Sequence, residues 1–460
     1  MIYNITDTDY YASVQRIRAY TAKKNRSAYV MVFGCQQNEA DGETIRGMLL
    51  DMGYTLCTSY EDADIIIVVT CAIRDHAEKK VLSMLGHFRK IKEKNPDLMI
   101  GIVGCMAAEP GVVDKLKKDF HYVTFTLQPN FLHKLPELIL NKLDKGKRSF
   151  YAEVDKGDVV EGAPVLRSDK FRAWVPIMYG CNNFCSYCIV PYVRGRERSR
   201  SADAIIKECK ELIASGVKEI TLLGQNVNSY KSDLSFPELL SAIADIEGEF
   251  ILRFMTSHPK DASDALISVM AAKSDKIAPF FHLPLQSGSN SVLKRMNRTY
   301  TRERYLSLIE KLRAAVPNIA LSTDIIVAFP NETDEDFAQT MDIIKSVGFD
   351  MVYSFIYSKR DGTVAAKMDS TVTEADKRRR MDELLAAQAV ISHEKNLPYL
   401  NRTVRVLAET VKNTDNGNIY TGRTDTNKTV HFKADSDVIG CFVNVLINEI
   451  GAFDLFGEII

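Results

Sequence analysis

Three apolar runs near the N-terminus each end on a cysteine. They are AYVMVFGC, which ends at Cys35, ADIIIVVTC, which ends at Cys71, and LMIGIVGC, which ends at Cys105. Helix-like stretches such as AEKKVLSMLGHFRKIKEKNP separate them. Buried apolar strands that alternate with helices predict a parallel α/β sheet. Because ligands of such sheets bind beyond the carboxyl ends of the strands, we expect the three cysteines to share one site there.

A second series of strand-like and helix-like runs begins after a polar stretch at 144–166. Helical patterns such as ADAIIKECKELIASG and RERYLSLIEKLRAAV separate most of its strands. Six strand–helix repeats are two short of an eightfold barrel, so they predict an open, partial barrel whose reaction face lies at the strand carboxyl ends. The strand-like runs are AWVPIMYG, EITLLG, ILRFMTSH, FFHLPLQ, ALSTDIIVAFP and MVYSFIYS.

The last segment changes to a β-rich pattern. A helical stretch at 371–396 leads into TVRVLAETV, DNGNIYTGRT, NKTVHFK and CFVNVLINEI, which predict a small β-barrel of about five strands. We therefore expect an α/β protein with several parts. They are a mobile N-terminal extension (1–25), a parallel α/β domain (26–143), a linker (144–166), a partial (βα)6 barrel (167–397) and a small β-barrel (398–460).

Composition is typical of a folded, multidomain protein. The chain has 460 residues, of which 46% are hydrophobic and 26% charged. Its longest apolar runs, such as IIIVV, are too short to span a membrane. The N-terminus lacks the pattern of a signal peptide, so we expect a cytoplasmic protein. In that compartment, scattered cysteines are more often ligands or catalysts than disulfide partners.

The net charge of −1 requires any nucleic-acid contact to be local. Two basic runs are candidates: Arg194, Arg196, Arg198 and Arg200 in the first, and Lys377–Arg380 in the second. Taken alone, such runs are more often solvated surface than binding sites.

The stretch GCNNFCSYC places Cys181, Cys185 and Cys188 in one loop after the first barrel strand. A structural zinc site normally has four ligands, and no fourth Cys or His follows nearby. Zinc with a remote fourth ligand is one interpretation. The other is a 4Fe–4S cluster held by three thiolates, whose fourth iron stays open as a catalytic site requires.

These motifs resemble known families. The GCNNFCSYC loop resembles the signature of the radical S-adenosylmethionine (SAM) superfamily. FGCQQNEAD, TCAIRDHAEKKV and GCMA resemble the methylthiotransferase family, and the resemblance extends over about 26–460. LGQNVNSY, TSHP, HLPLQSGSNSVLKRMNR and GRTDTNKTVHF are most similar to the branch that adds a methylthio group to isopentenylated adenosine beside the tRNA anticodon. The C-terminal barrel resembles the TRAM domain.

The resemblance implies two 4Fe–4S clusters, one on each cysteine triad, and two SAM molecules per turnover. SAM at the cluster of Cys181, Cys185 and Cys188 would give a radical able to attack an adenine C–H bond that is not acidic. The other cluster would supply sulfur, which the second SAM methylates. The implied SAM contacts are Tyr187, Gly224, Gln225, Asn226, Ser257, Gln286, Ser287 and Asp324, although loop capping would explain such polar strand-end residues equally well.

The resemblance also implies partners. We expect a monomer that binds the anticodon loop of tRNA, takes electrons from a donor such as flavodoxin or ferredoxin, and depends on sulfur and cluster-assembly proteins. The TRAM-like barrel holds six Lys or Arg against eight Asp or Glu, so bulk charge cannot attract RNA there. The expected RNA contacts are Arg194, Arg196, Arg198, Arg200, Arg423 and Lys428.

Other functions stay open at this point. The same chemistry could act on threonylcarbamoyl-modified adenosine in tRNA or on an aspartate of a ribosomal protein. A non-catalytic iron–sulfur RNA-binding protein, or an electron-transfer protein, would need closed four-ligand clusters instead. The remaining cysteines, Cys57, Cys209 and Cys441, do not match ligand positions, and we interpret them as packing residues.

Overall fold

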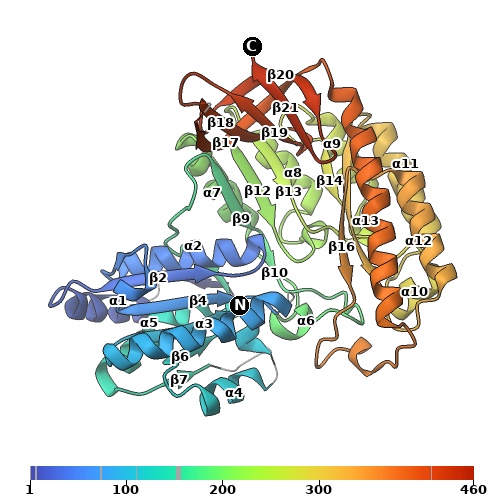
Figure 1. The fold of residues 1–460 in the computed structure, drawn as a ribbon. Coiled ribbons are helices and arrows are strands. Elements are labelled where there is room, and N and C mark those ends of the chain that lie inside the picture. The colour runs from blue at the N-terminus through green and yellow to red at the C-terminus, as the bar shows by residue number, and fades with distance from the viewer. Residues whose placement is uncertain (1, 6–7, 73–74, 110, 152–156, 416) are drawn as a thin grey trace.

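The computed structural model describes residues 2–5, 8–72, 75–109, 111–151, 157–415 and 417–460. Figure 1 shows a parallel sheet with helices at the lower left, an open barrel in the middle and a small β-barrel at the top. The predicted α/β class and these three architectures are confirmed. Among the described helices, none is both long enough and apolar enough to cross a membrane.

The N-terminal sheet is parallel and six-stranded, in the order β3-β2-β4-β5-β6-β7. Its central strands are buried along their whole length because helices cover both faces. Helices α1 (Thr8–Thr21), α2 (Gln36–Asp51) and α5 (Leu135–Lys145) cover one face, and α3 (Asp75–Lys94) and α4 (Val112–Asp119) cover the other. The strands are β2 (Ser27–Val32), β3 (Thr55–Leu56), β4 (Ile65–Thr70), β5 (Met99–Gly104), β6 (Phe125–Leu127) and β7 (Ser149–Phe150).

The N-terminal extension packs against this sheet. Strand β1 (Ile2–Asn4) pairs in parallel with β8 (Val159–Glu161), and α1 packs against α5. Tyr10, Val14 and Ile17 of α1 are buried in the core beside α2 and α5. The expected mobile arm is therefore wrong for the described residues of this segment.

The central barrel has six parallel strands in two groups, β9-β12-β13 and β14-β15-β16, which a bridge between Leu252 and Ile277 connects. In the part of the chain that the structure describes, β9 and β16 do not pair, so the barrel is open between them. Its strands are β9 (Arg172–Pro176), β12 (Glu219–Leu223), β13 (Ile251–Phe254), β14 (Phe280–His282), β15 (Ala320–Val327) and β16 (Met351–Ile356). Its helices are α7 (Ala202–Ala214), α8 (Phe236–Ala244), α9 (Asp264–Ala272), α10 (Asn290–Arg295), α11 (Arg302–Ala315), α12 (Asp334–Val347) and α13 (Glu374–Asn396).

The C-terminal segment forms a closed five-stranded barrel, in the order β17-β18-β19-β21-β20. Val406, Val430 and Leu455 are among the side chains that fill its interior. The strands are β17 (Thr403–Thr414), β18 (Gly417–Thr424), β19 (Thr429–Lys433), β20 (Phe442–Ile450) and β21 (Asp454–Ile459).

The C-terminal barrel closes the amino-terminal end of the central barrel. Buried Arg253 of β13 pairs with Glu219 at 2.7 Å, and it also donates to the backbone oxygens of Thr424 at 2.8 Å and Asp425 at 2.9 Å. Thr424 ends β18, and Asp425 lies in the turn between β18 and β19. Phe442 of β20 packs beside the core at the same end of the central barrel.

This docking changes the interpretation of two predicted RNA contacts. Lys428, in the turn between β18 and β19, is buried and pairs with Asp350 of the central barrel at 2.9 Å. Arg423 pairs with Glu409 at 3.2 Å and keeps 39% of its side chain exposed. The RNA prediction for Lys428 therefore needs correction, because its ammonium group is committed to the contact between domains.

Replacing Arg253 with Met should destabilise the protein. The change leaves Glu219 buried without its cation, and breaking a buried pair typically costs about 3–5 kcal/mol. We expect the thermal midpoint to fall by several degrees and the C-terminal barrel to become accessible to limited proteolysis. Arg89→Met removes an exposed pair with Glu93 at 3.1 Å and should change little. Equal midpoints for the two variants would contradict this role of Arg253.

Candidate cluster-binding sites

Cys35, Cys71 and Cys105 lie at the carboxyl ends of three neighbouring parallel strands, β2, β4 and β5. Cys35 directly precedes α2, and Cys105 begins the short 3-10 helix η2 (Cys105–Ala108). The three thiols are close enough for Cys71 and Cys35 to act electrostatically on Cys105. The fold therefore brings this triad together at one edge of the sheet.

Close packing of the backbone fixes the first of these loops. Gly34 has φ +136°, and a Cβ there would lie 2.6 Å from the side-chain nitrogen of Asn38 and 2.9 Å from Cβ of Cys71. Asn38 donates to the carbonyl oxygens of Phe33 and Thr70, both at 2.8 Å. The loops that follow β2 and β4 are thus held together by one amide side chain and by the absence of a side chain at position 34.

The second triad lies in the cysteine loop, residues 181–188, which follows β10 (Met178–Tyr179). Gly180 has φ +80°, and a Cβ there would lie 2.1 Å from the backbone oxygen of Arg196. The Gly180 N–H donates to the side-chain oxygen of Gln225 at 2.5 Å. A larger residue at position 180 would displace the start of the cysteine loop.

The end of α10 and the residues that follow it support the middle of the cysteine loop. Ser186 donates its N–H to Met296 O at 2.9 Å and its hydroxyl to Arg295 O at 2.8 Å. Asn297 donates to Phe184 O at 2.9 Å. These bonds satisfy backbone groups of an irregular loop, so the protein itself determines the loop's shape.

Both triads have the chemistry of an iron–sulfur ligand set. Burial is the main cause that raises the pKa of Cys105 and Cys188 to about 12 and that of Cys181 to about 11. A metal centre would reverse this shift, because coordination deprotonates a thiol. The structure describes all nine cysteines, and none forms a disulfide.

Within the described residues, no three His, Cys, Asp or Glu side chains are grouped to hold a single metal ion. A cluster spreads its thiolate ligands around several irons and does not need them to converge on one point. The assignment of the six cysteines to two clusters stays a prediction.

The arginines after the cysteine loop mostly contact other parts of the protein. Arg194 and Arg200 are buried, and Arg198 is partly buried. Their partners lie in the N-terminal part and in β8: Arg194 contacts Asp41 at 2.8 Å, Arg198 contacts Asn130 at 2.9 Å and Arg200 contacts Glu161 at 2.7 Å.

These contacts correct the prediction that all four arginines bind RNA phosphates. The guanidinium groups of Arg194 and Arg200 connect the central barrel to preceding parts of the chain and are not available to a ligand at the surface. Arg196 is the exposed member, and its guanidinium lies 4.3 Å from the ring centroid of Phe184. Of the four, Arg196 is therefore the best placed to contact RNA.

Two of the predicted SAM contacts have buried polar atoms without a partner in the described part of the chain. They are the hydroxyl oxygen of Ser257 and the side-chain oxygen of Asn226, whose amide nitrogen donates to Asp261 at 2.7 Å. Buried polar atoms normally have a hydrogen-bonding partner, and a ligand can provide one. Ser257 and Asn226 thus fit a SAM site at the strand ends.

The other predicted SAM contacts have identifiable structural environments. Gln225 supports the cysteine loop, Ser287 is buried 3.3 Å from the Thr340 hydroxyl, and Gln286 pairs through its backbone with β15. Tyr187 packs with its ring centroid 6.5 Å from that of Phe329. At Gly224, a Cβ would lie 2.6 Å from the side chain of Met178. Contact of these residues, and of Asp324, with SAM stays a prediction.

Apart from Asp324, the sequence did not predict a group of residues on the inner face of the barrel. His282 lies 2.9 Å from the Ser322 hydroxyl and 3.6 Å from the Asp324 carboxylate, and its ring centroid is 5.7 Å from that of Tyr353. Tyr353 is 42% and Phe355 47% exposed on the edge strand β16. The sequence does contain a signal for these positions. Successive side chains of a strand point to opposite faces, and the residues between these positions belong to the core that faces the helices.

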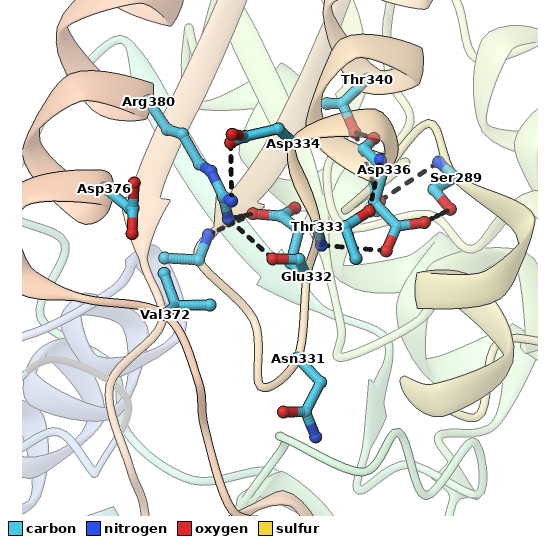
Figure 2. Close-up of polar contacts among 12 residues, drawn as sticks. Ser289, Asn331, Glu332, Thr333, Asp334, Asp336, Thr340, Val372, Asp376 and Arg380 are labelled. Carbon is cyan, nitrogen blue, oxygen red and sulfur yellow. Dashed lines mark hydrogen bonds and ion pairs between the residues drawn. The ribbon is translucent and has the colours of Figure 1, made fainter.

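The loop PNETDED, residues 330–336, and the basic run Lys377–Arg380 meet in one structural cluster. Buried Arg380 of α13 donates to the Glu332 carboxylate at 2.9 Å and to Asp334 at 3.0 Å, as Figure 2 shows. Asp336 accepts from Ser289 at 2.5 Å (Figure 2). These contacts connect α13, α12 and the turn before α10, so Arg380 is not a free RNA-binding side chain.

Of the remaining cysteines, Cys209 is buried in the core of the central barrel and Cys57 packs beside the N-terminal core. Cys441 is exposed, so its interpretation as a packing residue is wrong.

Comparisons with known proteins agree with this geometry. Residues 175–344 match the Radical SAM superfamily, residues 27–128 match the Uncharacterized protein family UPF0004 and residues 398–460 match the TRAM domain. The chain is 46% identical over 453 residues to the tRNA-2-methylthio-N(6)-dimethylallyladenosine synthase of Alkaliphilus oremlandii. The aligned residues cover 97% of this chain and 95% of that protein. It is 48% identical over 432 residues to the enzyme of that name from Acetivibrio thermocellus, with coverages of 93% and 90%.

Solved structures resemble the chain in fold. The radical S-adenosylmethionine methyltransferase TsrM from Kitasatospora setae matches with a TM-score of 0.55 at 12% identity, over 74% of this chain and 75% of that chain. The cobalamin-dependent S-adenosylmethionine radical enzyme OxsB matches with a TM-score of 0.51 at 13% identity, over 81% and 57%. At this level of identity the likeness concerns architecture alone, and it supports the open barrel described above.

The histidine that follows Ser257 predicts a pH dependence of stability. Burial, reinforced by the charges of Arg298 and Lys260, lowers the pKa of His258 to about 2. Below pH ~6.5 the unfolded chain therefore binds a proton that the folded protein does not, and stability falls by up to about 1.4 kcal/mol per pH unit. We expect denaturant unfolding to show this loss between pH ~6.5 and ~5.

His258→Asn should reduce that loss, because Asn can still accept the 3.2 Å bond from the Lys260 N–H but does not titrate. His133, whose pKa burial lowers to about 4, should maintain part of the dependence. His121→Asn changes an exposed residue and is the matched control. An unchanged slope in His258→Asn would contradict the prediction.

Proposed function

The chain belongs to the family of tRNA-2-methylthio-N(6)-dimethylallyladenosine synthases, the branch of the methylthiotransferases known as MiaB, and we propose that it catalyses the reaction of that branch. The substrate is an isopentenylated adenosine beside the anticodon of tRNA. An aromatic C–H bond is replaced by a carbon–sulfur bond, and the sulfur is methylated. The enzyme belongs to the radical SAM superfamily, which implies one 4Fe–4S cluster and SAM.

The observation that carries this proposal is the contact between two three-cysteine sites. Helix α6 (Val190–Val193) directly follows the cysteine loop and packs against η2, which begins with Cys105. Ala72, next to Cys71, lies in the same apolar cluster as Val193. A site that breaks a C–H bond and a site that supplies sulfur have to act on one substrate atom, and this packing supports such an arrangement.

The proposed roles of the side chains follow from the geometry. When bound, a 4Fe–4S cluster with SAM supplies the one-electron chemistry that a non-acidic adenine C–H bond requires. Cys181, Cys185 and Cys188 would hold that cluster, while Ser257 and Asn226 would donate to or accept from SAM. The second triad would hold a second cluster, and two SAM molecules would be used per turnover.

We place the modified base on the inner face of the barrel beside β16. Tyr353 and Phe355 have rigid aromatic side chains that are about half exposed on β16, and the Tyr353 ring lies beside that of His282. Exposed apolar surface of this kind often marks a ligand site. Stacking on the adenine and packing against the prenyl group are interactions that aromatic rings provide.

The partners follow from the same reaction. Arg196 beside the cysteine loop and Arg423 on the TRAM domain are the proposed RNA contacts, because both side chains retain exposure. The anticodon loop of tRNA would approach the carboxyl ends of the barrel strands. A one-electron donor such as flavodoxin or ferredoxin, together with sulfur and cluster-assembly proteins, would supply the enzyme, which we propose acts as a cytoplasmic monomer.

The activity is tested by mass spectrometry of tRNA nucleosides from cells with and without this gene. We expect the methylthio derivative of isopentenyladenosine to disappear and its unmodified precursor to accumulate. Loss of the methylthio form of threonylcarbamoyladenosine would assign the enzyme to another branch. A nucleoside profile that does not change, with a ribosomal-protein aspartate that loses its methylthio group, would reject a tRNA substrate.

Iron content tests the two cluster sites. Anaerobic reconstitution should load about eight irons per chain, as two four-iron clusters require. Changing Cys181, Cys185 and Cys188 to Ala should leave about half the iron and abolish formation of 5′-deoxyadenosine from SAM. Changing Cys35, Cys71 and Cys105 to Ala should also halve the iron but preserve SAM cleavage. If the variant without Cys35, Cys71 and Cys105 kept its full iron content, the second cluster would be rejected.

A further inference from the structure

Each cysteine triad has one buried arginine directed at one of its sulfur atoms. Arg194 Nε donates to Cys105 Sγ at 3.2 Å, and Arg298 Nη1 donates to Cys185 Sγ at 3.5 Å. The two residues are only 3% and 9% exposed. A buried guanidinium group is costly unless it is paired, so its placement beside a thiol requires an explanation.

Arg194 also determines how the two cysteine sites meet. It directly follows α6, so it belongs to the same segment as the cysteine loop, yet its guanidinium reaches the other triad. Its Nη2 donates to Asp41 at 2.8 Å and to Asn38 at 3.0 Å, while Nε is the atom that faces Cys105. A simple ion pair between domains would need only the Asp41 contact.

Arg298 is held in the same way on the other side. Its Nε donates to the hydroxyl of Tyr300 at 2.8 Å and its Nη2 to the backbone oxygen of Pro284 at 2.5 Å. These bonds fix the plane of the guanidinium and leave Nη1 directed at Cys185. The structure gives Arg298 no carboxylate partner within the described residues, so the thiolate is the anion best placed to compensate its charge.

We propose that Arg194 and Arg298 are positioning residues that hydrogen-bond one thiolate of each cluster and stabilise the cluster's reduced form. The inference rests on the proposed assignment of the two triads to two clusters. The reduction potential of an iron–sulfur cluster depends on nearby charge and on hydrogen bonds to its sulfur atoms. Reduction adds one electron and breaks no bond, so a fixed cation with an N–H directed at sulfur favours the reduced state.

The experiment uses the full-length protein with one cluster at a time. Cys181, Cys185 and Cys188 are changed to Ala to isolate the auxiliary cluster, and Cys35, Cys71 and Cys105 are changed to Ala to isolate the SAM-binding cluster. Arg194→Met and Arg298→Met are then introduced into both backgrounds. Each cluster is titrated with dithionite, and its midpoint potential is followed by EPR spectroscopy.

The two arginine variants serve as controls for each other. Arg194→Met should lower the midpoint potential of the auxiliary cluster and leave that of the SAM-binding cluster unchanged, and Arg298→Met should do the reverse. Potentials that stay unchanged, or that shift equally for both clusters, would overturn the proposal.

Conservative variants keep the proposal testable if a Met variant no longer binds the cluster that its arginine contacts. Arg194→Lys and Arg298→Lys retain the charge but lose the fixed planar donor, so each should shift its own cluster in the same direction as Met, by a smaller amount. A Lys variant with the wild-type potential would overturn the role of the hydrogen bond. The midpoint potential is measured without tRNA. An unchanged potential would therefore reject the role of the arginines without bearing on the tRNA substrate, which the nucleoside analysis tests separately.

Discussion

The structure depends on one constraint: buried thiols that lie close together need a positive partner. Burial keeps the pKa of Cys105 and Cys188 far above neutral pH, so three thiolates cannot coexist in either site without compensating charge. A metal cluster would provide most of this charge. The protein adds fixed donors, and it brings the cysteine loops together by close backbone packing at Gly34 and Gly180.

The same requirement explains how the parts of the chain are joined. The arginines after the cysteine loop connect the central barrel to the N-terminal part and β8, and two of them are buried. Breaking a buried pair is costly, so these contacts limit movement of one cysteine site relative to the other. A charge-rich stretch that resembles an RNA-binding surface thus connects the two cysteine sites, and of its four arginines only Arg196 is exposed.

The sequence predicted what depends on local pattern and failed where partners are distant in the chain. Apolar periodicity predicted all six barrel strands. The cysteines at three strand ends predicted that their side chains lie together at one edge of the sheet. A run of arginines does not reveal which carboxylates fold against it, so Arg194, Arg200 and Lys428 were misplaced. The docking of helix α1 against the N-terminal core likewise depends on tertiary packing that no short motif encodes.

The position of the C-terminal barrel limits how RNA can approach. It closes the amino-terminal end of the central barrel through Arg253 and Lys428, whereas the cysteine loop follows the opposite end of the strands. Strands of five or six residues are about 17–20 Å long. An RNA that touches both the C-terminal barrel and the cysteine loop therefore has to extend over this length of the central barrel, whose open side lies between β9 and β16. Tyr353 and Phe355 are exposed on the edge strand β16, which borders this open side.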